Sequence, residues 1–224
     1  MTTVPSAGAK VGSFVPERVG AVATAAPDPA LVARLLTIGG LSAAAADALD
    51  ARGFRLTVHA NQVPPLVDGQ VVIGRALTLR YLPARKEVGA REPLGRLAHR
   101  TVYDLAGPGD ILVISAPASI DASVMGGEAL AAAQAAGIAA VVVDGAVRDI
   151  DELLAVGIPV WAGRRTPLTG RGRIDAAEIN GPVEVAGVQV VPGDIVFADA
   201  SGITFVPAEL FAEVASEILG ITAA

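Results

Sequence analysis

The chain has 224 residues, enough for one sizeable α/β domain, and 52% of them are hydrophobic while only 4% are aromatic. A net charge of -6 with scattered arginines gives no basic surface for a phosphate backbone, so we expect no nucleic-acid binding. Cysteine is absent, which excludes disulfides, thiolate nucleophiles and Cys-ligated zinc. No apolar run reaches the length of about 18 residues that a membrane span needs, and we expect a soluble, cytoplasmic protein.

Two parts are predicted along the chain: an irregular N-terminal arm, residues 1–27, and a single α/β domain, residues 28–224. The arm is rich in Ala, Pro, Thr and Gly and shows no sustained periodicity. It is either loose or packed on a neighbouring subunit. Weak composition shifts along the remainder favour one domain.

Two short helices are predicted at the start of the domain. Asp28 followed by Pro29 is an N-cap with proline at the first helical position. This helix extends to about Ile38, where two glycines end it. Ser42 predicts the N-cap of the second helix, which extends from Ala43 to Arg52 before Gly53 ends it.

The middle of the chain alternates strands and helices. Gln70 to Leu82 is β-branched and largely alternating, with Gly74 as an expected bulge, and predicts a strand. A charged loop around Arg85 to Glu87 and a helix from Pro93 to Ala106 follow. A Gly-Pro-Gly-Asp turn then leads into a buried strand from Ile111 to Ser115.

The most regular stretch of the sequence is a helix followed by a strand. The helix begins after Gly126-Gly127, extends from about Glu128 to Ala136, and leads into a strand from Ala139 to Val143. With the strand before it, this stretch forms a strand–helix–strand unit, which implies a parallel pair and a right-handed connection. Asp144-Gly145 is expected to turn the chain.

The last third of the chain is predicted to be mostly β. A short helix from Asp149 to Val156 and a strand from Pro159 to Ala162 precede it. A final helix begins at Pro207. The strands expected between them are Val183 to Val190, Ile195 to Asp199 and Ile203 to Val206.

A ligand site is predicted where the central strand ends, because open α/β sheets bind ligands at the carboxyl ends of their strands. Gly126 and Gly127 let a ligand approach the backbone. The next amides, those of Glu128, Ala129 and Leu130, are expected to point outward at the positive end of the helix dipole. A small carboxylate would fit there.

Arg148 and Asp149 follow the same strand and supply charge. The planar guanidinium of Arg148 suits a carboxylate or an enolate oxygen. Asp149, Asp151 and Glu152 bring hard oxygen ligands suited to Mg²⁺ or Mn²⁺. Spacing alone also fits a surface N-cap with a salt bridge, so both interpretations stay open.

Gly127, twenty intervening residues, Arg148-Asp149 and then Glu152 resemble the G-x20-R-D-x2-E/D signature of the class II 4-hydroxy-4-methyl-2-oxoglutarate aldolases, relatives of the regulator of ribonuclease activity A. The sequences GIPVWA and VPGDIVFADASGITFVP agree with that family, as do ADALDARG and VVIGRALTL upstream. The resemblance extends over roughly Leu41 to Val206, most of the chain.

The resemblance implies a swivelling β/β/α-type sandwich with mixed, partly parallel sheets, assembled as a homotrimer or hexamer with active sites at subunit interfaces. By position, Asp149 would hold the divalent metal, Mg²⁺ or Mn²⁺, partly through waters. Arg148 would bind the substrate carbonyl and stabilise the enolate, and the amides after Gly126-Gly127 would hold the pyruvate carboxylate. Glu152 would position water or the metal shell, or else be a helix-surface acid.

The implied reaction cleaves a 4-hydroxy-2-oxo acid of the 4-hydroxy-4-methyl-2-oxoglutarate type to pyruvate. A metal ion and a guanidinium stabilise the enolate that this cleavage leaves. Decarboxylation of oxaloacetate gives the same enolate, so we expect both activities. The alternative is a non-catalytic, protein-binding regulator of ribonuclease activity on the same fold; Glu152 favours the enzyme, because the regulators tend to lose an acid at that position.

Composition argues against a Schiff-base aldolase. Lys10 and Lys86 are the only lysines, and neither lies near the motif. His59 and His99 are far apart in sequence, and a lone histidine is more often structural, so no shared histidine site is predicted.

Several other charged residues have two interpretations. Glu128 is a metal ligand or acid/base, or else a favourable charge at a helix start. Asp47 either reaches a neighbour's site or, as we favour, is a helix-face carboxylate. Asp144 is expected to order its loop by bonding the backbone. Arg164-Arg165 and Arg171 to Arg173 either recognise a second carboxylate or, as we favour, solvate a loop.

Overall fold

The computed structural model describes residues 19–21, 26–84 and 94–220. Most of the predicted N-terminal arm, and the charged loop predicted at residues 85–87, lie outside the described residues. Within the arm, Val19 forms a parallel bridge with Ile179, and the amide of Gly20 donates to the carbonyl of Ile179 at 2.8 Å. Residues 19–21 therefore lie along the edge of the main sheet.

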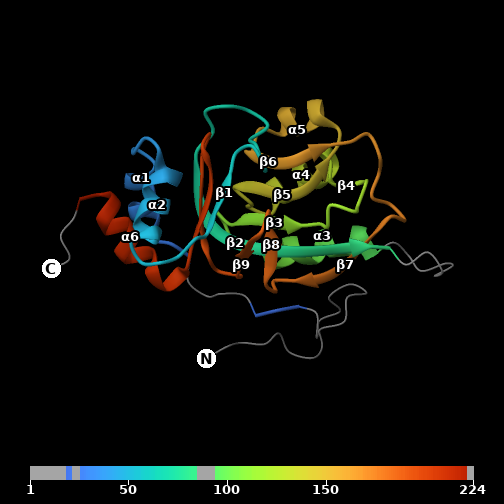
Figure 1. Ribbon diagram of the computed structural model, residues 1–224. Coiled ribbons are helices and arrows are strands. Elements are labelled where there is room, and N and C mark those ends of the chain that lie inside the picture. Colours follow the sequence, from blue (N-terminus) through green and yellow to red (C-terminus); the bar gives the residue numbers. More distant parts are fainter. Residues whose placement is uncertain (1–18, 22–25, 85–93, 221–224) are drawn as a thin grey trace.

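A mixed sheet, nine-stranded across the described residues, organises the fold (Figure 1). Its strand order is β1-β11-β10-β2-β3-β5-β4, with β6 beside β5 and β7 beside β2. The parallel centre consists of β2 (Val72–Pro83), β3 (Ile111–Ser115), β4 (Ser123–Met125), β5 (Ala140–Val147) and β6 (Val160–Arg165). This arrangement confirms the predicted α/β class with mixed, partly parallel sheets.

The antiparallel part of the sheet flanks β2, whose first residues pair with β10 and whose last residues pair with β7. A separate hairpin packs over the centre of the sheet. The strands of these two parts are β1 (Thr57–His59), β7 (Ile174–Ile179), β10 (Ile195–Ala198) and β11 (Gly202–Val206), and the hairpin strands β8 (Val183–Val185) and β9 (Val188–Val190).

The helices form two groups, which cover different parts of the sheet (Figure 1). One group packs on the antiparallel end around Phe197 and Phe211, and comprises α1 (Pro29–Leu35), α2 (Leu41–Asp50), η2 (Ala208–Leu210) and α6 (Phe211–Ile218). The other covers the parallel strands, and comprises α3 (Leu94–Leu105), α4 (Gly127–Ala135) and α5 (Ile150–Val156). Among the described residues, no helix combines the length and the apolar character that crossing a membrane requires.

The strand–helix–strand prediction is confirmed, because β3 and β5 pair in parallel from Ile111↔Ala140 to Ser115↔Asp144. The strand bounds predicted for β3 are also those observed. Asp28 caps α1 as predicted, by accepting a hydrogen bond from the amide of Ala30 at 2.9 Å. These features share one property: the signals that predict them are local in the sequence.

Ser42 does not cap the second helix, and that prediction was wrong. α2 begins two residues earlier than predicted, at Leu41, with Gly40 as its N-cap. The amide and hydroxyl of Ser42 donate to the two carboxylate oxygens of Asp199 at 2.9 and 2.6 Å. The acceptor for this helix end therefore comes from a residue 157 positions away in the sequence, just after β10.

Gly74 is not a bulge, which also corrects the prediction. It pairs regularly with Val196, and the register shift in β2 falls between Arg80 and Tyr81. A methyl group on Gly74 would lie 2.3 Å from the carbonyl oxygen of Gly109. The glycine is thus needed for a close backbone approach, the other common reason for glycine in a strand.

Asp144-Gly145 does not turn the chain: β5 continues through it to Val147, since β6 supplies pairing partners up to Arg165. The segment predicted as one strand at 183–190 is instead the β8–β9 hairpin. Ala186 (φ 47°) and Gly187 (φ 88°) form its turn, both in the left-handed region that two-residue hairpin turns require. The short strands β1, β4 and β7 had no strong pattern in the sequence and were missed.

Candidate functional site

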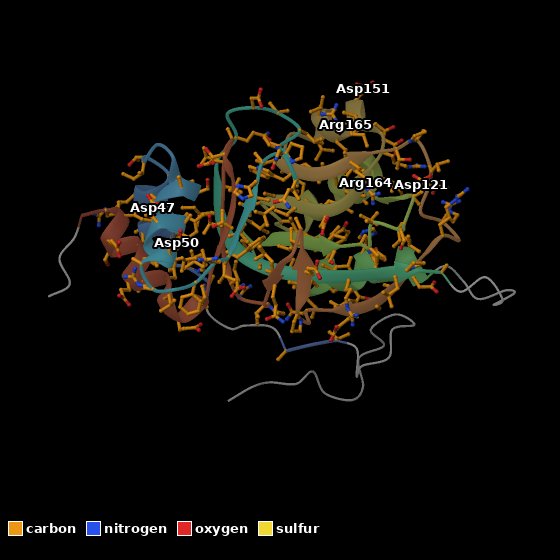
Figure 2. The ribbon with its side chains drawn as sticks, viewed as in Figure 1. Asp47, Asp50, Asp121, Asp151, Arg164 and Arg165 are labelled. Atoms are coloured by element: carbon orange, nitrogen blue, oxygen red, sulfur yellow. The ribbon has the colours of Figure 1, made fainter. Side chains whose placement is uncertain are left out.

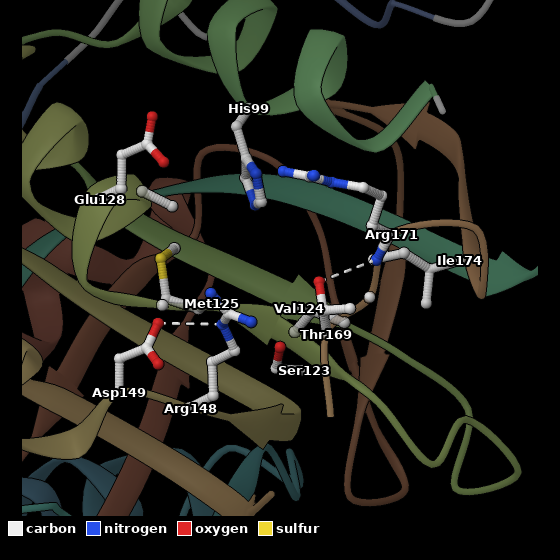
Figure 3. A pocket seen from close by; sticks show the side chains of 13 residues that line it. His99, Ser123, Val124, Met125, Glu128, Arg148, Asp149, Thr169, Arg171 and Ile174 are labelled. Carbon is white, nitrogen blue, oxygen red and sulfur yellow. Dashed lines mark hydrogen bonds and ion pairs between the residues drawn. The ribbon is translucent and has the colours of Figure 1, made fainter. Parts of the chain in front are cut away.

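Two cavities open at the carboxyl ends of the central strands, on opposite faces of the sheet. The smaller, of about 150 Å³, faces α3 and α4 and is called here the Arg148 cavity. The larger, of about 860 Å³, lies under the β8–β9 hairpin and is called the Asp144 cavity. The two cavities can use different residues of the same strands, because neighbouring residues of a strand point to opposite faces of the sheet. The polar side chains that line the Arg148 cavity are those of His99, Ser123, Glu128, Arg148, Asp149, Thr169 and Arg171 (Figure 3).

Arg148 and Asp149 form an ion pair on the wall of the Arg148 cavity, with Nε of Arg148 2.9 Å from Oδ2 of Asp149. Asp149 precedes α5 in a left-handed conformation (φ 54°) and makes no side-chain cap. Of the surface alternative, the salt bridge is present, and Asp149 occupies the N-cap position of α5 without a side-chain cap bond. The functional interpretation stays a prediction. The side chains remain 39% and 33% exposed, and within the described part of the chain the terminal nitrogens of Arg148 have no further partner.

Gly126 and Gly127, called here the glycine corner, join β4 to α4 directly beside this pair. Gly126 has an extended backbone (φ -147°) and is the N-cap of α4, with no side-chain cap bond. A methyl group on Gly126 would lie 2.9 Å from Oδ2 of Asp149 and 3.3 Å from Cγ of Arg148. Glycine here lets the charged pair lie against the helix N-terminus.

Glu152 has a place in the structure that spacing did not show. It is exposed and does not line the Arg148 cavity, but a methyl group on Gly127 would lie 2.2 Å from its Oε2 and 2.4 Å from its Cβ. The spacing between Gly127 and Glu152 thus corresponds to a close contact between the first turns of α4 and α5. Its predicted catalytic role stays a prediction.

Three amides were predicted to be unpaired, those of Glu128, Ala129 and Leu130, and for Leu130 the prediction was wrong. The amide of Leu130 donates to the carbonyl of Gly126 at 3.0 Å, because α4 begins one residue earlier than predicted. The amides that precede the first intrahelical bond are those of Gly127, Glu128 and Ala129. They provide the positive end of the helix dipole, and Glu128 and Ala129 line the cavity.

His99 belongs to this cavity, although the sequence analysis set it aside. Its Nε2 lies 3.1 Å from the hydroxyl of Tyr81, and its ring stacks on Tyr103 with 6.0 Å between centroids. Burial lowers the pKa of His99 to about 4, and a hydrogen bond to the backbone of Val124 raises it only in part. The ring is therefore neutral at physiological pH. The only signal in the sequence was the four-residue spacing of His99 and Tyr103 on one helix face.

The loop arginines divide by location. Arg171 lines the Arg148 cavity, opposite Asp149 in the close-up view (Figure 3). Arg164 donates to the carbonyls of Ala118 and Ile120, and Arg173 to that of Thr169, so these two order loops. Only Arg171 is placed to meet a ligand in this cavity.

The carboxylates suit a cation that keeps most of its water. Asp149 and Glu128 both line the cavity, while no group of three or more His, Cys, Asp or Glu side chains within the described ranges could hold a metal ion. Mg²⁺ commonly binds through one or two carboxylates and retains several waters. Asp47 lies on α2, at the other end of the molecule from Asp151 on α5, so within one chain it is remote from this site (Figure 2).

The Asp144 cavity has a different character. The sequence analysis predicted that Asp144 orders its own loop, and that prediction was wrong. The amide of Ala186 donates to Oδ2 of Asp144 at 2.8 Å, so this carboxylate orders the turn of the β8–β9 hairpin. Burial raises the pKa of Asp144. Arg80, on the same wall, pairs with Glu178 at 2.8 Å, while its Nε is buried without a partner.

Chemically, the Arg148 cavity combines three things: helix-terminal amides for an anion, a guanidinium with two available nitrogens, and carboxylates for a cation. Such a constellation suits a small oxo acid whose carbonyl oxygen becomes negatively charged during reaction. Arg148 and Asp149, and Glu128 and Ala129 from the helix start, come together as the sequence predicted.

Several known proteins are similar to this chain. The model of the RraA-like family (Aldolase/RraA) matches residues 42–205. Protein DlpA of Legionella pneumophila is 32% identical over 182 residues, which are 80% of this chain but only 28% of that protein. A protein of Halalkalibacterium halodurans named "Putative 4-hydroxy-4-methyl-2-oxoglutarate aldolase" is 34% identical over 161 residues, 72% of this chain and 70% of that protein.

Among solved structures, RraAS2 of Streptomyces coelicolor is similar with a TM-score of 0.74 and 29% identity. The match covers 87% of this chain and 92% of that one. RraAS2 is described as an unusual member of the RNase ES inhibitor RraA protein family. One similar protein is therefore named as a putative aldolase, and another is described as a member of a ribonuclease inhibitor family.

Proposed function

This chain belongs to the RraA-like family, and from that premise we propose that it is a divalent-metal-dependent lyase that cleaves a 4-hydroxy-2-oxo acid, of the 4-hydroxy-4-methyl-2-oxoglutarate type, to pyruvate. Decarboxylation of oxaloacetate is proposed as a second activity of the same site. The observation that carries the proposal is the ion pair of Arg148 and Asp149, which lies against the unpaired amides of a helix start.

In this mechanism, the chain's own groups bind and orient the substrate. The amides of Gly127, Glu128 and Ala129 donate hydrogen bonds to the C1 carboxylate, as helix N-termini do for anions. The terminal nitrogens of Arg148 donate to the 2-oxo oxygen. Asp149, with Glu128 nearby, would hold Mg²⁺ or Mn²⁺, which when bound acts as a Lewis acid on that oxygen.

Bond cleavage then moves charge toward Arg148. A base takes the proton of the 4-hydroxyl group, and C4 becomes the carbonyl carbon of the second product as the C3–C4 bond breaks. The electron pair of that bond forms the enolate of pyruvate, which is then protonated at C3. The negative charge appears on the 2-oxo oxygen, where a prepositioned guanidinium is worth about 3–4 kcal/mol of transition-state stabilisation. Oxaloacetate loses CO₂ instead and leaves the same enolate.

A pyruvate-release assay tests this proposal. Oxaloacetate and 4-hydroxy-4-methyl-2-oxoglutarate are supplied to the wild type with Mg²⁺ and with chelator, and to Arg148→Ala with Mg²⁺. We expect turnover that chelator abolishes and that Arg148→Ala lowers by at least about 100-fold, the loss typical of one oxyanion donor. Turnover that does not depend on metal, or none with any 2-oxo acid, would contradict the proposal.

We also propose that the protein assembles as a homotrimer or hexamer with its sites at subunit interfaces. The exposed fractions of Arg148 and Asp149, 39% and 33%, support this, since a neighbouring subunit would cover them and exclude water from the reaction. Light scattering coupled to gel filtration measures the assembly. A fully active monomer would overturn this part of the proposal.

The similarity to RraAS2 favours one second candidate, a non-catalytic regulator that binds a ribonuclease through its surface. Such a regulator does not need the Arg148 cavity. A ribonuclease assay with added wild type or Arg148→Ala separates the two functions. Equal inhibition by both proteins, together with no pyruvate release, would favour the regulator.

A further inference from the structure

Two side chains of α3 hold the backbone on either side of the glycine corner. The hydroxyl of Tyr103 donates to the carbonyl of Ala129, in the first turn of α4, at 2.7 Å. His99, one helical turn earlier on α3, is hydrogen-bonded to the backbone of Val124 in β4. The corner of Gly126 and Gly127, which has the most backbone freedom of any dipeptide, therefore lies between two external anchors.

The two anchors form one unit. His99 and Tyr103 are four residues apart on one helix face, and their rings are stacked with an interplanar angle of 10°. His99 also lines the Arg148 cavity, above Met125 and Ser123 in the close-up view (Figure 3). The same ring thus contributes to the cavity wall and to the support of the glycine corner.

Two hydrogen bonds hold the ring of His99. The bond to Val124 favours the protonated ring, so the imidazole donates it and the carbonyl of Val124 accepts. The hydroxyl of Tyr81 lies 3.1 Å from Nε2 of the same ring. The ring is thus held between Tyr81 and the backbone of Val124, which fits a positioning role.

We propose that His99 and Tyr103 are positioning residues that hold the amides of Gly127, Glu128 and Ala129 in the orientation that binds a carboxylate. The inference rests on the proposed function of the Arg148 cavity. The carboxylate is held before and during bond cleavage alike, so loosening its amides weakens the ground state and the transition state together. KM should therefore rise while kcat changes little.

Tyr103→Phe tests the inference most directly, because it removes one hydroxyl and keeps the ring. We expect KM for oxaloacetate, and the inhibition constant of pyruvate, to rise about 3- to 10-fold, with kcat within about 2-fold of wild type. In the unliganded protein, hydrogen exchange over residues 126–130 should become faster. His99→Phe should act in the same direction, and His99→Asn, which keeps a donor for Val124, should be closer to wild type.

The matched control is Thr78→Val. The hydroxyl of Thr78 donates to the carbonyl of Gly181 at 2.6 Å, and both are remote from the glycine corner. This variant also loses a bond from a side-chain hydroxyl to a backbone carbonyl, here a fully buried one. It should lose stability without a change in KM or in exchange over residues 126–130. If Tyr103→Phe behaves like Thr78→Val, or lowers kcat at constant KM, the inference is overturned.

Failure of the proposed function gives a different result. If the wild type releases no pyruvate from any 2-oxo acid, the lyase proposal fails, while exchange over residues 126–130 and binding of pyruvate alone still test the positioning role. Faster exchange and weaker pyruvate binding in Tyr103→Phe than in Thr78→Val would support it. Unchanged exchange would contradict it.

Discussion

The Asp144 cavity is several times larger than the Arg148 cavity, yet the smaller one has the groups a ligand needs. In the Asp144 cavity the charged side chains already serve the fold: Arg80 pairs with Glu178, and Asp144 accepts the amide of Ala186. In the Arg148 cavity, the available groups are the helix-start amides and the terminal nitrogens of Arg148. In the Asp144 cavity the group without a partner is a single buried nitrogen, Nε of Arg80, whereas in the Arg148 cavity the available groups converge at one helix start. Volume alone therefore does not identify a site.

Replacing one arginine in each cavity gives the largest expected contrast. Arg148→Ala should lower pyruvate release by at least about 100-fold, because it removes the donor to the developing oxyanion. Arg80→Ala removes a partly exposed ion pair with Glu178 and should leave turnover within about 2-fold of wild type. Steady-state rates of both variants are the measurement. A large loss in Arg80→Ala would show that the Asp144 cavity takes part in the reaction.

Replacing one glycine in each cavity should give a smaller contrast. A methyl group on Gly126 would displace the carboxylate of Asp149, which lies 2.9 Å away, and turnover should fall roughly 10- to 100-fold. Gly187, in the hairpin turn, has open space around it but a φ of 88°. Gly187→Ala should therefore cost about 1 kcal/mol of unfolding free energy with no change in rate.

Urea titrations and rate measurements of the two glycine variants check this pair. Equal losses of activity would mean that the hairpin and the Arg148 cavity are coupled across the sheet. That outcome would contradict the expectation that only the Arg148 cavity takes part in the reaction.

The smallest expected effect is the pH dependence of Asp144→Asn. Burial raises the pKa of Asp144, so the folded state binds this proton more tightly than the unfolded state does. The stability that this gives is fully present at low pH and is lost as the pH rises through the folded-state pKa. An asparagine loses nothing over this range and can still accept the amide of Ala186.

Relative to wild type, Asp144→Asn should therefore gain unfolding free energy as the pH rises above about 4, near the ordinary pKa of a carboxyl group. The gain should stay below about 1 kcal/mol, because solvent screens a partly exposed group. Urea unfolding at several pH values measures it, with pyruvate release as the control that should not change. A gain that shrinks as pH rises would contradict the assigned direction of the shift.

Much of the fold could be predicted because its signals are local. The apolar run from Ile111 to Ser115 lies between turns and has the length of a strand, which is too short for a typical helix. Asp28 and Pro29 start α1 through contacts within one helical turn. The adjacency of Arg148 to the glycine corner was also predictable, because open α/β sheets bring strand ends and helix starts together at one edge.

By itself, the sequence determined the α/β class, the parallel centre and the charged motif at its edge, since each depends on residue periodicity or on neighbours in the chain. Only the tertiary structure decided that Asp199 accepts hydrogen bonds from Ser42, that β5 continues through Asp144, and that His99 lines the Arg148 cavity. These facts depend on which distant backbone groups need partners once the layers have packed. A local pattern carries no information about partners that packing brings from elsewhere in the chain.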